Sequence, residues 1–483
     1  MMGISGSLSN ALSGLTATSR MAELVSSNIS NALTDGYGKR DIALSAAALG
    51  PSSGGVRIDG MTRHVNAGLL SDRRLADSEF AGQQRLSAFY FDLERSFGLP
   101  EDPSGLSNRL SSFEQALYAA ENDPASEQLL VSVARSLGAV ATKLNAMTDD
   151  VQAMRQQADA YIAQDVEVLN TALAQIEDLN GKITRAYAGG GNPLALEDQR
   201  QVVIDRIAKI TPLRVLPRDN GAVALYSKSG ATLIDGQAPT FEFTHSATIV
   251  ADMTFAGGVL GGITRNGVPM STDNGFGRLS GGSLEAAFVA RDSVLTQAQA
   301  HLDGIASDLV LRFEDVANDP SLTLGDPGLL TDAGGSFDPL DQVGIAGRIE
   351  LNVLVDPDAG GDATLIRDGL GALTPGAAGD STQINRWINA LGDARSPGFG
   401  VPTLTADGQV SRVGEIFGVQ RVLGDEDLSF AAARWDSLRQ AELADGVDTD
   451  QEMQRLLLIE QAYAANAKVI QTIGTLIQRL MEI

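Results

Sequence analysis

Histidines and carboxylates are the side chains from which this chain could build a hydrolytic or metal-dependent site. The chain has three histidines, His64, His245 and His301, and no two of them stand at the i+2, i+3 or i+4 spacing of paired metal ligands. A Ser-His-Asp triad can converge from distant positions, but no GxSxG turn accompanies these histidines. His301 falls in an expected helix, where we expect a surface or core-edge residue. The histidines therefore predict no catalytic or metal site.

Two glycine-rich segments could be mistaken for phosphate-binding loops. GGGNP (189–193) and GFGRLSGG (275–282) fit neither GxGxxG nor GxxxxGK[ST]. We expect the first to end a helix and the second to be a hinge.

One acidic segment resembles part of a calcium loop. DPDAGGD (356–362) places Asp356, Asp358 and Asp362 at positions 1, 3 and 7. Position 12, where a bidentate glutamate is needed, is Arg367. We therefore expect a flexible acidic loop, and the sequence predicts no catalytic residue, no cofactor and no metal.

Composition limits the classes of function further. The chain has 483 residues, a net charge of −25 and no cysteine. The negative charge argues against binding to nucleic acid or to an anionic membrane surface. The missing cysteines exclude disulfides and thiolate chemistry. No apolar run is long enough to insert into a membrane, and the N-terminus lacks the pattern of a Sec signal peptide.

Two apolar stripes with heptad spacing occupy the two ends of the chain. Steps of four and three residues put each stripe on one helix face, as in a coiled coil. A stripe at a chain end needs a partner, either the other end of the chain or another subunit. The first stripe consists of Ile4, Leu8, Ala11, Leu15, Thr18, Ala22, Val25, Ile29 and Ala32. We expect an assembly interface at its members Leu8, Leu15, Ala22, Val25 and Ile29, and at Leu456, Ile459, Tyr463, Asn466, Ile470, Ile473, Ile477 and Leu480 of the second stripe.

The longest expected helix lies in the proline-free stretch between Pro124 and Pro193. Its apolar heptads run from Leu130 to Ala158 and continue, shifted by one residue, from Ile162 to Ile183. One helix of about 60 residues would be about 90 Å long. We expect this stripe to be internal core.

Other helices are expected up to residue 33 and over 65–96, 106–121, 196–210, 282–319, 382–391, 429–444 and 449–481, with Thr449 and Glu452 as a capping box for the last.

These elements predict a mainly α fold with β insertions: terminal coiled-coil helices, a long helical-bundle domain, a small β-rich insertion and an α+β outer domain. Short extended pieces are expected over 41–66, and the outer domain has one expected strand, 348–355. The expected domains are 1–64 with 445–483 (terminal helices, disordered in the monomer); 65–212 with 277–320 and 428–444 (bundle); 213–276 (insertion); and 321–427 (outer domain).

SSNISNALTDGYGKR (26–40) resembles the N-terminal turn motif of flagellar axial proteins. Asn28, Ile29, Asn31, Gly36 and Tyr37 occupy the motif positions, and Asp35 stands where proline is common. EQAYAANAKVIQTIGTLIQRL (460–480) resembles the C-terminal motif of the same proteins. The resemblance implies that Asn28, Asn31, Gly36 and Tyr37 belong to the assembly interface.

The middle of the chain resembles the hook-associated protein 1 family of the hook–filament junction. The similar segments are NDPASEQ (122–128), LEDQRQVVIDRIAKI (196–210) and the helix that starts at GGSLEAAF (281–288). The resemblance implies an extracellular flagellar adaptor, secreted by type III flagellar export without a cleaved Sec signal. It also implies contacts with the hook protein and the second junction protein, self-assembly in the axial ring, and an export chaperone on the C-terminal helix.

Two alternatives stay open at this stage. The chain could be another flagellar axial protein, either the hook protein or the second junction protein. It could also be a secreted enzyme such as a peptidoglycan hydrolase, with its site in the outer domain.

Overall fold

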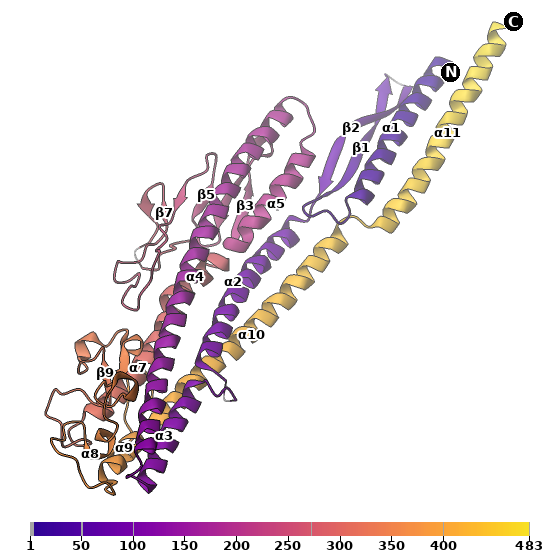
Figure 1. Ribbon diagram of the computed structural model, residues 1–483. Helices are drawn as coiled ribbons and strands as arrows, with labels where there is room; N and C mark the ends of the chain where they lie inside the picture. The colour runs from indigo at the N-terminus through magenta and orange to yellow at the C-terminus, as the bar shows by residue number, and fades with distance from the viewer. Residues whose placement is uncertain (1–3, 50–51, 100, 272, 399, 483) are drawn as a thin grey trace. The chain divides into compact units, whose positions relative to one another are not determined.

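The computed structural model describes residues 4–49, 52–99, 101–271, 273–398 and 400–482. In this part of the chain the fold is mainly α, with small antiparallel sheets, as predicted (Figure 1). The chain divides into two compact units. Unit 1 comprises Met1–Phe80, Val168–Thr240 and Ala431–Ile483, and unit 2 comprises Ala81–Glu167 and Phe241–Phe430.

Unit 1 contains both terminal helices. Its helices are α1 (Ile4–Ser30), α5 (Leu194–Ile210) and α11 (Thr449–Met481), together with the start of α2 (Ala67–Phe97) and the ends of α4 (Glu127–Ala188) and α10 (Ala406–Asp445). Its strands are β1 (Lys39–Leu49) and β2 (Ser52–His64), which pair as one hairpin, and the meander β3 (Leu213–Pro217), β4 (Val223–Ser227) and β5 (Thr232–Ile234). The extended pieces expected over 41–66 are therefore the two strands of one ribbon.

Unit 2 holds the remaining parts of α2, α4 and α10 and the loop-rich segments. Its other helices are α3 (Leu106–Asn122), α6 (Gly282–Val289), α7 (Leu295–Glu314), α8 (Leu365–Asp368) and α9 (Thr382–Gly392), and a π-helical turn (Ala290–Val294) joins α6 to α7. Its strands are β6 (Phe241–Glu242), β7 (Thr264–Arg265), β8 (Val268–Pro269), β9 (Leu330–Asp332) and β10 (Ile349–Leu351). The strand expected over 348–355 is therefore shorter, and a turn follows it.

The heptad stripe of α4 is internal core, as predicted. Leu130, Val140 and Leu144 are fully buried in the core of unit 2. Where the heptad shifts by one residue, α4 instead buries two charged side chains, Arg155 and Asp159. Arg155 donates to the carbonyls of Arg291, Val250 and Met253. The shift therefore anchors the loop at 250–253 and the π-helical turn onto α4.

Helix α10 begins far earlier than the helix expected over 429–444. Its first half contains glycines, which lower helix propensity and read as loop in the sequence. The structure gives these glycines a packing role, because a Cβ at Gly414 would lie 2.7 Å from Phe97 Cε1 and one at Gly424 would lie 2.7 Å from Tyr90 Cδ2. The glycines let α10 approach α2 closely. The boundary expected at residue 427 lies inside this helix.

The capping box expected at Thr449 and Glu452 is wrong. Asp448 caps α11, since its carboxylate accepts hydrogen bonds from the N–H groups of Asp450 and Gln451. Glu452 is thereby free to turn away from the helix end, and it is 1 % exposed. In the described part of the chain, no helix is long and apolar enough to cross a membrane.

Candidate functional site

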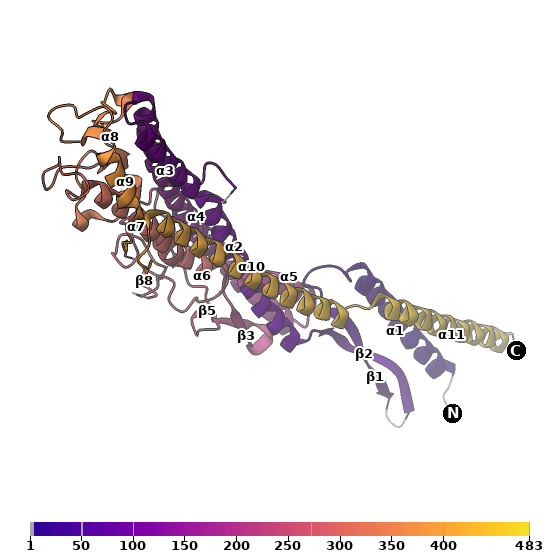
Figure 2. The ribbon, with the colours of Figure 1, turned by 90° about the horizontal axis from the view of Figure 1, so that it is seen from below.

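Helices α1 and α11 lie side by side and antiparallel within unit 1 (Figures 1 and 2). Asn28, near the end of α1, bonds to Glu452 at the start of α11. Fourteen residues earlier, Gly14 lies against Asn466, where an added Cβ would be 2.9 Å from Asn466 Nδ2. The small residue at position 14 permits this close approach, so the two ends of the chain are each other's partner along this face.

The residues expected at the assembly interface fall into three groups by burial. Val25, Asn28, Ile459 and Ile473 are buried. A second group is partly buried: Leu8, Leu15, Ala22, Ile29, Asn31, Gly36, Tyr37, Leu456, Asn466 and Ile470. Tyr463, Ile477 and Leu480 remain exposed on α11, at 45 %, 38 % and 59 %.

Asn28 is the polar centre of the α1–α11 pair. Its Oδ1 accepts hydrogen bonds from Tyr37 Oη (2.8 Å) and from the Arg40 N–H (3.1 Å). Its Nδ2 donates to the Arg40 carbonyl (3.0 Å) and to Glu452 Oε2 (3.1 Å). The amide thus uses both donors and both acceptor sites. One side chain ties α1 to the following turn, to β1 and to α11.

Glu452 completes this centre with a buried carboxylate. Lys39 Nζ lies 3.4 Å from its Oε1. A buried carboxylate is costly unless it is paired and hydrogen-bonded. Asn28 and Lys39 together meet that need, so the centre is specific for this pairing of the chain ends.

Asp198 on α5 holds the turn after α1 and the hairpin. Its Oδ1 accepts from Arg63 Nε (2.6 Å) and the Gly38 N–H (3.1 Å), and its Oδ2 accepts from Arg40 Nη2 (2.5 Å). The turn needs glycine at position 36, where φ is +78° and a Cβ would lie 2.6 Å from a methyl of Val202. The motif residues therefore position the terminal helices from within the chain.

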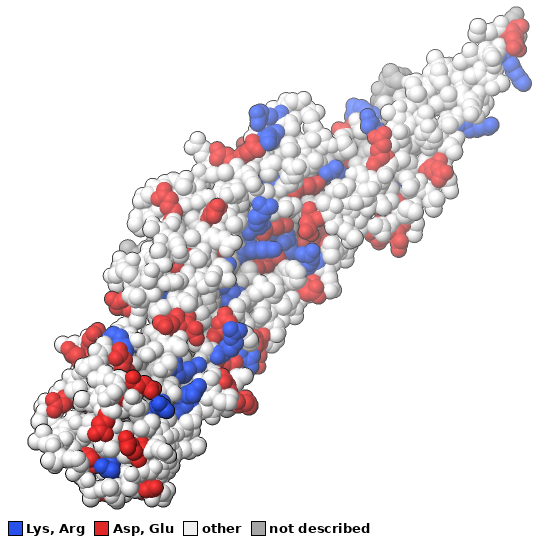
Figure 3. Space-filling view, in the orientation of Figure 1, with Lys and Arg blue, Asp and Glu red and all other residues white. Residues whose placement is uncertain are grey.

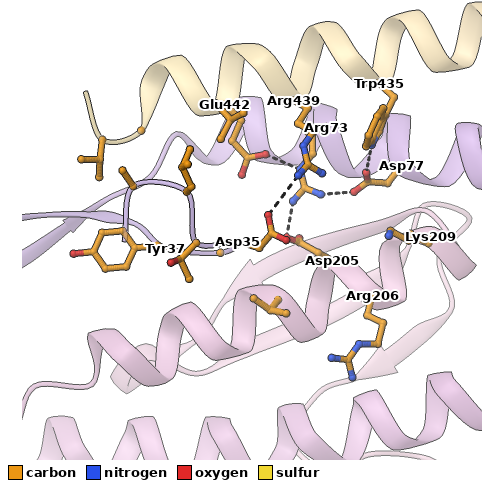
Figure 4. A pocket seen from close by; sticks show the side chains of 18 residues that line it. Asp35, Tyr37, Arg73, Asp77, Asp205, Arg206, Lys209, Trp435, Arg439 and Glu442 are labelled. Carbon is orange, nitrogen blue, oxygen red and sulfur yellow. Dashed lines mark hydrogen bonds and ion pairs between the residues drawn. The ribbon is translucent and has the colours of Figure 1, made fainter. Parts of the chain in front are cut away.

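A cluster of ion pairs around Arg73 joins α2, α5 and α10 in unit 1 (Figure 4). Arg73 pairs with Asp77, with Asp205 (2.6 Å) and with Glu442 (2.7 Å). Trp435 Nε1 donates to Asp77 Oδ1 (2.7 Å). Burial raises the pKa of Glu442 and of Asp77 above their ordinary values.

This cluster borders a pocket of about 270 Å³, which the turn at 32–37 also lines. The Arg73 guanidinium forms ion pairs with carboxylates from three helices, so the cluster has a structural role in holding α2, α5 and α10 together. Among the described residues, no group of three or more His, Cys, Asp and Glu side chains could hold a metal ion.

A second apolar stripe on α11 was not expected from the sequence. The outer stripe consists of Leu458, Ala462, Ala465, Val469, Thr472 and Leu476, each one residue before a member of the predicted stripe. All six are exposed, and Leu458, Val469 and Leu476 are 65 %, 45 % and 47 % exposed. Few charged atoms lie over the α1–α11 pair (Figure 3). The signal in the sequence is the same heptad spacing, displaced by one position.

Comparison with known proteins gives two matches to protein families. The family described as the flagellar hook-associated protein FlgK helical domain matches residues 93–328. The family described as the flagellar basal body rod FlgEFG protein C-terminal matches residues 444–483, which include α11.

Several curated relatives are similar to this chain. Flagellar hook-associated protein 1 of Bacillus subtilis is 24 % identical over 501 aligned positions, which cover 96 % of this chain and 95 % of that protein. The protein of the same name from Salmonella typhimurium is 30 % identical over 48 % of this chain and 43 % of its own length. A solved structure, of the flagellar hook junction protein FlgK from Burkholderia pseudomallei, aligns at a TM-score of 0.44 and 19 % identity, over 55 % of this chain and 47 % of that one.

The helical-domain match, the C-terminal match and the near full-length relative agree with one another and with the paired terminal helices. The chain is therefore similar to the FlgK family of flagellar hook-associated proteins.

Proposed function

We propose that this chain is an adaptor subunit of the hook–filament junction and that it assembles through segments 1–64 and 445–483. The observation that carries the proposal is the outer stripe of α11. One face of α11 packs on α1 of the same chain, and the neighbouring face is apolar and exposed. A helix with two adjacent apolar faces can join two partners at once.

Contact through the outer stripe would be heterologous, because the stripe differs from the face that packs on α1. Heterologous contacts build rings or open helical assemblies rather than closed dimers. Each fully buried Leu or Val would contribute on the order of 1–3 kcal/mol. Burial of several such positions favours assembly and opposes the repulsion between subunits whose net charge is −25.

The partners that we propose are neighbouring copies of this chain, the hook protein and the second junction protein. An export chaperone would cover the outer stripe before secretion. Support comes from the exposed apolar surface on α11 and from the names of the relatives, which place those proteins at the hook.

The test introduces two charges into the outer stripe. Val469→Asp with Leu476→Asp should leave the α1–α11 pair unchanged, while it prevents incorporation and gives hooks without filaments in a strain that lacks the native protein. The same result is expected when the purified variant is added from outside, which bypasses secretion. The matched control is Gln471→Asp with Gln478→Asp, which adds the same charge on another face of α11 and should assemble. Normal filaments on the double variant of the outer stripe would contradict the proposal.

A further inference from the structure

An amine, a carboxamide and a carboxylate meet in the buried centre between α1, β1 and α11. The Lys39 amine and the Asn28 amide contact one carboxylate, that of Glu452: Lys39 Nζ lies 3.4 Å from Oε1, and Asn28 Nδ2 donates to Oε2 at 3.1 Å. Asn28 is fully buried, Glu452 is 1 % exposed, and the Lys39 side chain is 19 % exposed. These three groups are the nucleophile, the electrophile and the base that an exchange of amide nitrogen requires.

The carbonyl oxygen of the Asn28 side chain is held by two hydrogen-bond donors. Tyr37 Oη donates to Oδ1 at 2.8 Å, and the Arg40 N–H donates to it at 3.1 Å. A nucleophile that adds to Cγ moves the carbonyl electron pair onto Oδ1. Donors at these distances stabilise the negative charge that forms there. The turn and β1 hold both donors in place, so the Asn28 carbonyl is prepared for attack.

The residue type at position 39 decides whether attack can occur. Arg455 Nη1 also approaches Glu452 Oε1, at 3.9 Å, but a guanidinium does not lose its proton in a protein. The lysine amine is a nucleophile once it has lost a proton, and its flexible stem lets Nζ approach Cγ. Glu452 contacts Nζ and is placed to take that proton. Burial keeps water from competing with the amine.

We propose that Lys39 and Asn28 form an isopeptide bond, with Glu452 as the base and the acid of the reaction. Glu452 takes a proton from the Lys39 ammonium, and the free amine adds to Asn28 Cγ while the carbonyl electron pair moves to Oδ1. Glu452 gives the proton to Nδ2, the Cγ–Nδ2 bond breaks, and ammonia leaves as the carbonyl re-forms. Glu452 then removes the second proton from Nζ and passes it to ammonia. The products are the new amide, ammonium and the original carboxylate.

The bond fixes the turn that follows α1. It closes a ring through residues 29–38, because Asn28 lies near the end of α1 and Lys39 begins β1. Glu452 belongs to α11, so the bond forms only in chains whose α11 has packed on α1. A cross-link of this kind restricts the unfolded chain and stabilises the folded one. The turn that positions the two chain ends then becomes covalent.

Mass spectrometry of the purified, incubated full chain tests for the bond. The chain should be lighter than its sequence mass by one ammonia. Trypsin should no longer cleave after Lys39, whose amine has become an amide, and should release residues 21–40 as one peptide. Fragmentation of this peptide should give no ions from cleavage between positions 28 and 39, because the ring holds both parts together.

Two variants remove the chemistry and keep the charge or the shape of the side chain. Lys39→Arg keeps the positive charge beside Glu452 but has no nucleophilic amine, so it should retain the full sequence mass. Glu452→Gln loses the base and should slow bond formation about a hundredfold or more. Matched controls at exposed positions are Lys182→Arg on α4 and Glu460→Gln on α11, which should lose ammonia as the native chain does.

A further measurement separates lost chemistry from lost folding. Hydrogen exchange of the α11 amides in Lys39→Arg should show that α11 still packs on α1. The native chain incubated in urea should keep its full sequence mass, because the three groups then no longer meet.

Three results would overturn the proposal. One is a folded native chain that keeps its full sequence mass. Another is loss of ammonia that persists in Lys39→Arg, since the product would then be a cyclic imide at Asn28. The third is bond formation in Glu452→Gln at the native rate, which would exclude Glu452 from the reaction.

Discussion

A single amide, that of Asn28, fixes how the two ends of the chain meet. Its four hydrogen bonds join α1, the turn, β1 and α11, and it supplies a donor to the buried carboxylate of Glu452. The turn motif identified Asn28 and Tyr37 from the sequence, but not their partners. Glu452 was expected to cap α11, and only the fold brings it to Asn28, because the two residues are 424 positions apart.

The cluster around Arg73 was not predicted at all. Its members come from α2, α5 and α10, and no local spacing in the sequence relates them. Charged residues in helices usually lie on the solvated face, so the pattern alone gave no reason to bury Arg73 and Asp77.

Replacing Asn28 with alanine should loosen the α1–α11 pair. The change leaves Glu452 buried without one of its donors and should cost about 1–3 kcal/mol of opening free energy. Hydrogen exchange of the α11 amides measures that free energy. Asn31→Ala is the control, since among the described residues the Asn31 side chain bonds to Ser27 and Thr34 nearby. Equal protection of α11 in both variants would contradict the role given to Asn28.

Glu314 in unit 2 should make stability depend on pH. Burial, the largest effect, raises the pKa of Glu314 from its ordinary 4.5 to about 7, although the Phe337 N–H donates to the carboxylate. The native state therefore binds more protons than the unfolded state, and stability falls as pH rises from about 4.5 through 7.

Glu314→Gln removes this titration and keeps an acceptor for the Phe337 N–H. The variant should gain stability relative to the native chain between pH 5 and pH 8, as measured by urea unfolding at both values. Glu350→Gln, at an exposed position, is the control. A stability difference that is the same at both pH values would show that Glu314 does not titrate in this range.

At the scale of elements, heptad spacing and proline-free length predicted α3, α4, α5 and α9 to within a few residues. Apolar periodicity reports which face is buried, and it does so well where Leu, Ile and Val carry that face. It failed over the first half of α10, where Gly414 and Gly424 take the place of large apolar residues. It also missed the outer stripe, whose members have the same spacing one position earlier along α11.

Gly414→Ala tests whether the glycines of α10 serve close packing. Alanine is the better helix former by about 1 kcal/mol, yet its Cβ would lie 2.7 Å from the buried Phe97 ring. We expect the variant to lower the melting temperature of unit 2. Gly138→Ala on α4 is the matched control, since its Cβ would meet Leu351 at an ordinary 3.5 Å, and it should be neutral or stabilising. A Gly414→Ala variant as stable as the control would show that the close approach is unimportant.

At the scale of the whole molecule, the similarity to flagellar hook-associated proteins indicates a structural component of the flagellum rather than an enzyme. The apolar stripes at the two chain ends and the motifs at 26–40 and 460–480 predicted this class. The division into two units was not predicted, because α2, α4 and α10 each belong to both. Unit 1 contains the terminal helices, and unit 2 contains the large helical core.

On assembly, the outer stripe of α11 should become buried between subunits. Because the chain has no cysteine, Leu476→Cys provides a unique thiol in the outer stripe. Its maleimide labelling rate should be high in the free subunit and should fall at least tenfold in isolated hook–filament junctions. Leu340→Cys, at a position that is 96 % exposed in unit 2, should label in both states. A thiol at position 476 that labels equally fast before and after assembly would contradict the account.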